Sequence, residues 1–346
     1  MMEKENTIRV NRLPAITWHT LKINDATLSV PDRFTAPTCT MEGNLASSPV
    51  EFKEIRSGSG EAFDSLLSGT AVQTYDVVST DNAEVPVRFH FAPVSDAAEA
   101  AVLRLVAKKN ENLTVITDIT GEEHASLYLQ ILLDIDQGAT VKLVQVQAMP
   151  SSSILVNAVG GTVGENGNVE LVQLLLGGEK TYASSRISLS GNESKLNASL
   201  AYLGEKDSLT DLNYHAVHEG KRTESSFETY GVLRDNSRKT YRGTIDFLRG
   251  SSGSVGTEYE DVLLLGEDVR NKSIPLILCA EEDVQGAHGA SIGQLDDDML
   301  FYLGSRGIDP KTAEKLMAKA KLDTVAHRIG DEKAEEMAET TIEGQF

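Results

Sequence analysis

The chain has 346 residues, with 52 acidic and 32 basic side chains and a formal net charge of −20. A chain of this length can bury a large core and is expected to form two or three structural units. The acidic excess argues against nucleic acids and anionic membranes as partners, because both need clustered Lys and Arg. With only two cysteines, Cys39 and Cys279, one chain can form neither a disulfide framework nor a four-cysteine metal or cluster site.

The first residues are charged and lack the apolar stretch of a signal peptide, and no run of about 18 apolar residues occurs anywhere. We therefore expect a soluble, cytoplasmic protein. Residues 1–75 combine short helical and loop signals, because Pro14, Pro31, Pro37 and Pro49 interrupt any longer periodicity. They are predicted to form an N-terminal mixed helical and loop region.

Residues 76–295 are predicted to be a β-rich core. Short runs of Val, Ile, Leu and Thr alternate here with Gly, Asn, Asp and Ser. Segment 139–146 places alternate side chains on opposite faces, which indicates a half-buried strand. Segments 171–176, 187–189 and 244–247 predict further strands. Turns are indicated between strands by Gly167-Asn168, Gly191-Asn192 and Asp235-Asn236.

So long a series of short strands is compatible with a sandwich, a barrel or a β-helix. The apolar runs recur at roughly 20 to 30 residues, a spacing compatible with the stacked coils of a solenoid. The low aromatic content of 5% and the many Val, Leu and Ser residues suit a narrow coil better than an aromatic-rich sandwich. The spacing alone does not decide among the three.

Residues 296–346 are predicted to form a short helical subdomain. Asp296 is a candidate N-cap, and Asp309-Pro310 has the N-cap and first-turn proline that begin a second helix. An apolar stripe follows at Ala313, Leu316, Met317 and Ala320, and a third stretch has one at Ala334, Met337, Ala338 and Ile342. These stripes either pack against the β-rich core or form a partner-binding groove.

Few catalytic motifs are present. Gly220-Lys221 continues with Arg222 and has no glycine five residues before it, so the phosphate-binding loop of nucleotide hydrolases is absent, and we expect this chain to bind no nucleotide. His215 and His218 lie three apart on a predicted strand, so they point to opposite faces and are a poor metal pair.

Two acidic stretches are weak candidate metal sites. The run 258–261 includes Glu260, which could hold iron transiently through a hard carboxylate ligand. We favour a structural interpretation of this run over a metal-binding one, namely that it is the solvated rim of a strand. Glu282 belongs to a second acidic stretch, 281–283, a few positions before His288. His288 stands between small residues in a predicted loop, where a neutral imidazole could reach ferrous iron.

Five short blocks in the C-terminal part carry a specific resemblance. They are Glu282–Val284, Ala287–Ala290, Gly293–Asp296, Phe301–Leu303 and Ser305–Ile308. Together they resemble the C-terminal signature of the SufB/SufD family, the scaffold subunits of the SUF iron–sulfur cluster assembly machine. The resemblance implies a mainly β fold with a right-handed parallel β-helix core, an N-terminal mixed region and a short C-terminal helical subdomain.

The details resemble the SufD branch. SufB-type chains carry Glu-His-Glu where this sequence has Ala287-His288-Gly289, and the position of their sulfur-accepting cysteine is occupied by Glu260. SufD-type chains often have a cysteine two residues before the histidine, and Gly286 stands there instead. Cys279 is a weak substitute ligand, since it follows an apolar run and is expected to be a small buried hydrophobe.

The resemblance implies a non-catalytic scaffold subunit of a SufBCD-type complex. Such a subunit pairs with a SufB-like chain, contributes His288 to a transient iron or nascent iron–sulfur cluster site at the dimer interface, and docks the SufC ABC ATPase through its C-terminal helices. Deleting those helices is expected to leave the β-rich core folded. Residues expected to contact the ATPase are Phe301, Tyr302, Arg306, Leu316 and Met317.

Two alternatives remain open. A homodimeric scaffold could work with the ATPase alone, and the absence of a SufB-like chain from the purified complex would distinguish it. A β-helix carbohydrate-active enzyme would need a pair of carboxylates in a cleft and usually has aromatic sugar platforms, which the single Trp of this chain disfavours.

Overall fold

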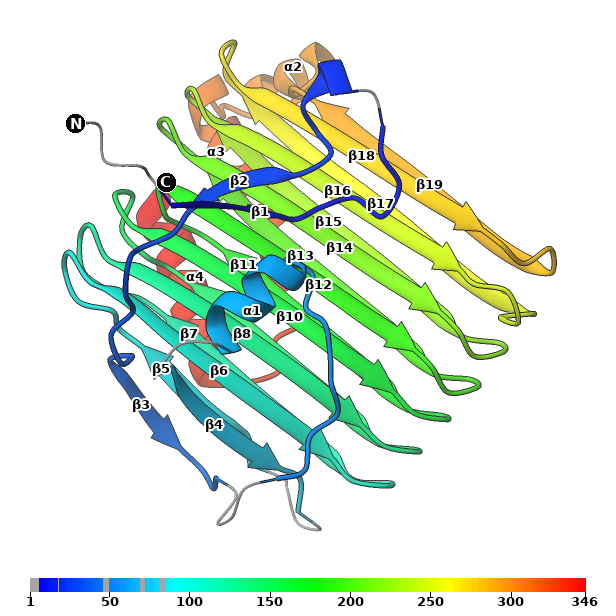
Figure 1. Ribbon diagram of the computed structural model, residues 1–346. Helices are drawn as coiled ribbons and strands as arrows, with labels where there is room; N and C mark the ends of the chain where they lie inside the picture. Colours follow the sequence, from blue (N-terminus) through cyan, green and yellow to red (C-terminus); the bar gives the residue numbers. More distant parts are fainter. Residues whose placement is uncertain (1–5, 18, 46–49, 69–71, 81–84) are drawn as a thin grey trace.

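The computed structural model describes residues 6–17, 19–45, 50–68, 72–80 and 85–346. Two large parallel sheets lie face to face and are joined at every coil, so the chain forms a parallel β-solenoid of about 8 turns in the part that the structure describes (Figure 1). The predicted parallel β-helix core is confirmed.

Successive strands alternate between the two sheets. The first sheet contains, in chain order, β4 (Gln73–Val78), β6 (Ala98–Ala107), β8 (Ser126–Ile135), β10 (Ile154–Val163), β12 (Lys180–Leu189), β14 (Leu209–His218), β16 (Arg238–Phe247) and β18 (Arg270–Cys279). The second contains β3 (Cys39–Glu42), β5 (Val87–Phe91), β7 (Asn112–Ile119), β9 (Thr140–Gln147), β11 (Asn168–Leu175), β13 (Lys195–Gly204), β15 (Glu224–Arg234), β17 (Ser254–Leu265) and β19 (Val284–Gly293). We call them the even and odd sheets.

The coils stack in register. Register pairs Thr162 with Ser188, Lys195 with Glu224 and Arg238 with Arg270, at separations of 26, 29 and 32 residues. The coil length therefore lies in the upper part of the expected spacing and just beyond it. Neighbouring strands are parallel, except that β3 joins β5 antiparallel. The predicted turns at Gly191-Asn192 and Asp235-Asn236 both connect one sheet to the other.

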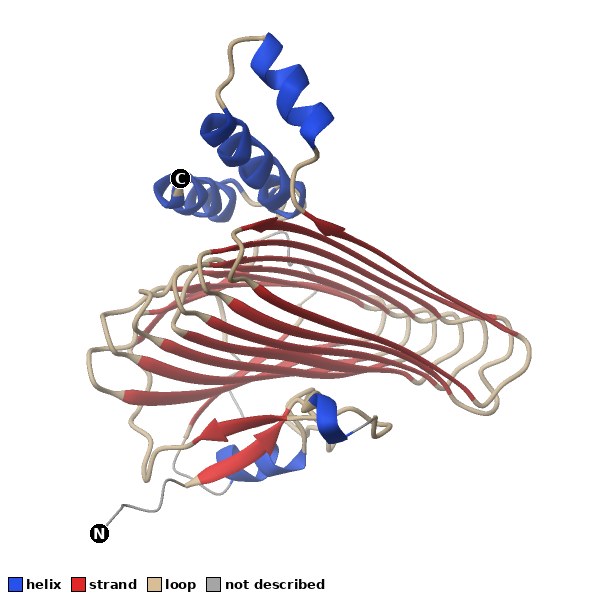
Figure 2. Ribbon diagram, turned by 90° about the horizontal axis from the view of Figure 1, so that it is seen from above, coloured by secondary structure: helices blue, strands red, loops and turns tan. Residues whose placement is uncertain are grey.

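Apolar side chains fill three layers. The largest cluster lies between the sheets and includes Leu103, Leu143 and Ile187. A second lies on the outer face of the odd sheet, under α3 (Pro310–Ala326) and α4 (Glu332–Gln345). The third lies on the outer face of the even sheet. Figure 2 shows the C-terminal helices on one side of the solenoid and the N-terminal region on the other.

The N-terminal region packs across the even sheet. It consists of β1 (Thr7–Val10) paired antiparallel with β2 (Ala26–Ser29), the short 3-10 helix η1 (His19–Leu21) and α1 (Glu61–Ser68). The short β1–β2 ribbon was not predicted from the sequence, where only helical and loop signals were recognised.

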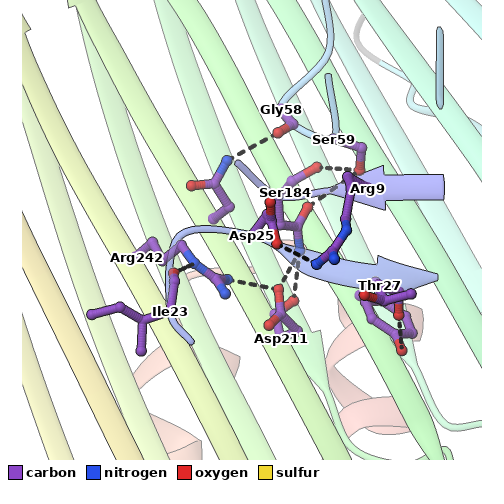
Figure 3. Close-up of polar contacts among 12 residues, drawn as sticks. Arg9, Ile23, Asp25, Thr27, Gly58, Ser59, Ser184, Asp211 and Arg242 are labelled. Carbon is purple, nitrogen blue, oxygen red and sulfur yellow. Dashed lines mark hydrogen bonds and ion pairs between the residues drawn. The ribbon is translucent and has the colours of Figure 1, made fainter. Parts of the chain in front are cut away.

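Hydrogen bonds to a buried ion pair of the even sheet attach this region (Figure 3). Arg242 on β16 donates to Ile23 O at 2.6 Å and to Asp211 Oδ1 at 2.7 Å, and Asn11 donates to the same Asp211 oxygen at 2.7 Å. Each of these three side chains is at most 6% exposed. Since Ile23 O and Asn11 provide hydrogen bonds to this buried pair, the N-terminal region is tied to β14 and β16.

Helix caps form where the sequence indicates them, but of one predicted apolar stripe only Ala313 and Met317 pack inward. Asp296 caps α2 (Asp297–Ser305) by accepting from Met299 N, and Asp309 caps α3 by accepting from Thr312 N. In α3 the buried face runs through Ala313, Ala318, Leu322, Val325 and Ala326, whereas the predicted Leu316 and Ala320 are exposed. The stripe predicted for α4 is confirmed, with Ala334, Ala338 and Ile342 buried and Met337 packed beside them.

Candidate site at the open end of the solenoid

The last coil, formed by β18 and β19, is open to solvent. Each is the final strand of its sheet, so one backbone edge of each has no neighbouring strand among the described residues. Most side chains of β19 are exposed, whereas those of the coils before it are mostly buried. This end is seen as the orange strands of Figure 1.

His288 lies within β19 and not in a loop, so the predicted local structure was wrong. Its register partner on β17 is Glu258, which in turn pairs with Phe227 on β15. Register partners in parallel strands point to the same side, and Glu258 and Phe227 are buried inside the solenoid. His288 therefore faces the solenoid axis, and it is exposed because no further coil covers it.

The acidic run 258–261 is not a solvated rim, and that interpretation was wrong. Glu258 is 5% exposed and Glu260 is 2% exposed, because both point inward on β17. Asp261 points outward and pairs with Lys321 of α3 at 2.5 Å. Strict alternation along the strand thus divides the run into an interior pair and an exterior pair.

Lys239 compensates the interior charge. Its ammonium group forms an ion pair with Glu260 and also donates to Asn271 Oδ1 at 2.8 Å and Ser273 Oγ at 2.9 Å. It lies 5.3 Å from the ring centre of Tyr241, a cation–π distance. Burial lowers the pKa of Lys239, an effect that Glu260 opposes. Glu260 is therefore engaged by this lysine and not free to serve as a metal ligand.

Glu258 is the interior carboxylate next to His288. Burial raises its pKa to about 7, and the nearby charge of Glu260 adds to the effect. Gly243 provides the space for it, since a Cβ atom there would lie 2.0 Å from Glu258 Oε1. Neighbouring strands lie about 4.8 Å apart, so this carboxyl and the His288 imidazole are adjacent side chains. The one signal of this pairing in the sequence is the separation of 30 positions between the two residues, which is one coil.

The other predicted ligands lie apart from His288. Gly286 faces Ile277, since a Cβ at Gly286 would lie 2.8 Å from Ile277 Cγ2. His288 is two residues further along β19, while Cys279 is displaced from Ile277 toward the turn. Cys279 is exposed and not a buried hydrophobe. Glu282 is exposed in that turn, about 20 Å from His288 along an extended strand at about 3.3 Å per residue.

The metal-binding prediction for His288 remains a prediction. Among the described residues, no three His, Cys, Asp or Glu side chains are arranged to hold one metal ion. The chain offers an exposed imidazole with one ionisable carboxyl behind it.

The predicted partner-binding residues form an exposed apolar surface on α2 and α3. Phe301 is 80% exposed, Tyr302 54% and Leu316 49%. The guanidinium of Arg306 lies 5.2 Å from the ring centre of Tyr302. Met317 differs from the others, since it packs partly against the helix-covered face of the odd sheet. We call Phe301, Tyr302, Arg306 and Leu316 the α2 surface.

The fold places the chain among the parallel β-solenoid proteins. A family model described as "SUF system FeS cluster assembly, SufBD core domain" matches residues 91–321, about two thirds of the chain. The chain belongs to this SufBD family of iron–sulfur cluster assembly proteins, as the C-terminal blocks indicated. No helix of the described residues is long and apolar enough to cross a membrane.

Relatives give the same assignment. The iron–sulfur cluster assembly protein SufD of Bacillus subtilis is 24% identical over 69% of this chain and 52% of its own length. A SufBD family protein of Staphylococcus saprophyticus is 27% identical over 50% of this chain and 37% of its own length. A chloroplastic SufBD family protein of Arabidopsis thaliana is 25% identical over 50% of this chain and 31% of its own length. The chain thus spans about half or less of the length of these relatives.

Neutralising Glu258 is expected to change the pH dependence of stability. Its folded pKa of about 7 lies above the ordinary value of 4.5, so its contribution is favourable at low pH and is lost as pH rises from 4.5 through 7, by about 3 kcal/mol in all. Glu258→Gln removes this loss. Urea unfolding should show the variant to be more stable than the wild type by up to that amount at pH 8, and nearly equal at pH 4. A difference independent of pH would contradict the raised pKa, and Glu224→Gln, on the surface, is the control.

Proposed function

We propose that this chain is a SufD-like scaffold subunit of a complex that assembles iron–sulfur clusters. The observation that supports it most is the open terminal coil, in which two ten-residue strand edges flank the inward-facing His288. The chain itself carries out no turnover, and iron or the nascent cluster is its cargo.

The open edges favour a second solenoid as the partner. Exposed strand edges present unpaired N–H and C=O groups and are natural sites for adding strands of another chain. A SufB-like chain docked end to end would continue both sheets and enclose His288 between the two subunits. A second copy of this chain could do the same through a twofold axis, so a homodimer remains the alternative outcome.

His288 and Glu258 suit a transient iron site. Imidazole and carboxylate are both ligands of ferrous iron, and a site that leaves positions open can release its cargo. The remaining ligands would come from the partner chain. The raised pKa of Glu258 means that its carboxyl exchanges a proton near neutral pH, so metal binding there would release that proton.

Co-purification tests the assembly. The full chain, tagged and co-expressed with a SufB-like chain and a SufC-like ATPase, should form a stable complex with both. Ile292, an exposed apolar residue of β19, lies at the proposed seam, so Ile292→Asp should abolish pairing with the SufB-like chain. Pairing unaffected by this change would contradict end-to-end docking, and recovery of a complex containing only this chain and the ATPase would support the homodimer.

Replacing His288 should separate assembly from cluster formation. His288→Ala removes an exposed side chain, so the unfolding free energy should change by less than about 0.5 kcal/mol and the complex should still form. Loss of a ligand should reduce iron affinity at least about tenfold, measured as iron and sulfide content and by Mössbauer spectra of the purified complex. His124→Ala, also an exposed histidine, is the matched control. Unchanged cluster content would show that His288 is not a ligand.

A further inference from the structure

A second candidate site lies on the outer face of the even sheet, apart from the open end formed by β19. A cavity of about 480 Å³, open to solvent on one side, lies between the N-terminal region and the outer face of the even sheet. Its charged and titratable lining consists of Arg12, Arg56, Arg186, His215, Glu61 and Asp246. Three guanidinium groups thus face two carboxylates, although the chain as a whole carries a charge of −20.

The wall contributed by the N-terminal region is fixed to the strands. Gly58 N donates to Val159 O at 3.0 Å, and Asn213 Nδ2 donates to Gly58 O at 2.9 Å. Ser59 Oγ lies 2.8 Å from Ser184 Oγ. Figure 3 shows Gly58 and Ser59 lying over the strands, with Ser59 beside Ser184. The cavity is therefore a built feature of the fold, since backbone and side chains on both sides hold its walls.

The backbone of Arg56 packs closely against the even sheet. A Cβ atom at Gly160 of β10 would lie 2.5 Å from Arg56 O. Only glycine at this position therefore leaves room for the backbone of Arg56 against the strand. Gly60 precedes the first residue of α1, and the positive end of that helix dipole lies at the rim.

Residues on the outer face of the even sheet form the other wall of the cavity. Arg186 on β12 pairs with His215 on β14, and both project from the outer face into the cavity. In the row before them, Ser184 and Asn213 hold the N-terminal region, as described above. The register pair Ser184 and Asn213 therefore attaches the covering segment. The pair Arg186 and His215, two residues further along the same strands, lines the cavity beneath that segment.

Several of these lining groups lack partners. Within the described residues, Arg186 makes no ion pair, and burial lowers its pKa even though Glu219 and Asp246 oppose the effect. His215 Nε2 has no hydrogen bond, lying 3.5 Å from Asp246 Oδ2, and its side chain is 12% exposed. Asn213 Oδ1 is also without a partner, on a residue that is 3% exposed. Buried polar groups in this condition are costly unless a ligand or water satisfies them.

We propose that this cavity binds a small molecule through an oxyanion group, a phosphate or a carboxylate. Guanidinium groups bind both through paired N–H donors, and His215 Nε2 provides a further donor beside Arg186. The volume exceeds that of a single phosphate ion and falls in the range of small-molecule sites. An adjoining hollow of about 610 Å³ shares Arg12 and adds Lys22 and Arg9, the last paired with Asp25 at 2.7 Å.

Calorimetric titration of the full chain at low ionic strength tests this, with pyrophosphate and citrate as probes. We expect saturable binding of at least one probe with one site per chain. Pyrophosphate alone would identify a phosphate ligand, and citrate alone a carboxylate. Arg186→Gln should weaken binding about tenfold or more, because it removes a charge-assisted pair. It should leave folding intact, since Arg186 makes no ion pair within the part of the chain that the structure describes.

Two further measurements exclude general charge effects. Arg222→Gln removes an exposed arginine paired with Glu193 and should leave binding unchanged. Bound probe should also shift the His215 imidazole resonance in the proton NMR spectrum, which binding at the surface would not do. Arg56→Gln, on the covering segment, repeats the test independently of the strand. The proposal is overturned if neither probe binds, or if Arg222→Gln weakens binding as much as Arg186→Gln.

Discussion

Glu260→Ala is expected to destabilise the protein by about 3 to 5 kcal/mol, the range measured when one partner of a buried ion pair is removed. Lys239 has no exposed side-chain surface, so the variant leaves an ammonium group inside the solenoid with only Asn271 and Ser273 as acceptors. The loss should be visible as a lower urea midpoint by circular dichroism. The cost follows from the interior position of Glu260, which the sequence interpretation had placed on a solvated rim.

Two variants control for this result. Glu193→Ala breaks the exposed pair with Arg222 and should cost less than about 1 kcal/mol. Replacing both members of the buried pair, as Lys239→Met with Glu260→Leu, should recover most of the loss, since apolar side chains of similar volume often substitute for buried pairs at little cost. If Glu260→Ala unfolds at the wild-type urea concentration, then Lys239 is hydrated and the interior is wetter than its burial indicates.

The strands and helix caps could be predicted because their signals are local and repeated, whereas the solenoid was predicted from the family resemblance. Strands such as 139–146 alternate cleanly, caps such as Asp309 lie where a proline follows, and the C-terminal blocks carry the resemblance. The interior charges could not be predicted by the same reasoning, because an acidic run looks polar whichever way its members point. Only the register shows that Glu258 and Glu260 share the inner face with Val262.

The candidate site was predicted in part for a related reason. His288 was recognised from its sequence neighbours, Glu282 among them, but a strand carries sequence neighbours away at about 3.3 Å per residue. Its spatial neighbour, Glu258, lies one coil earlier. In a solenoid the residues that meet are those one coil apart, so a site is found by aligning coils and not by scanning along the chain.

Removal of the helices after Gln294 is expected to damage the β-solenoid, whereas the sequence-based expectation was that the core stays folded. They cover Ile116, Val144, Leu174, Leu203 and Val232 on the odd sheet, each at most 4% exposed. Exposing this face should cost on the order of 10 kcal/mol at roughly 1.5 to 3 kcal/mol per large apolar side chain. We therefore expect the truncated chain to aggregate or unfold at lower urea concentration, so its loss of ATPase binding would not identify the docking site.

The α2 surface allows a sharper test, because none of its residues supports the core. Phe301→Ser combined with Leu316→Ser should leave the urea midpoint unchanged, since both side chains are largely exposed. If the surface docks the SufC-like ATPase, the double variant should weaken that association about tenfold or more, as expected for apolar residues at the centre of an interface. Val85→Ser removes another exposed apolar side chain away from these helices and serves as the control. Wild-type affinity in the double variant, measured by titration calorimetry, would assign ATPase docking to another part of the chain and leave the exposed Phe301 without an explanation.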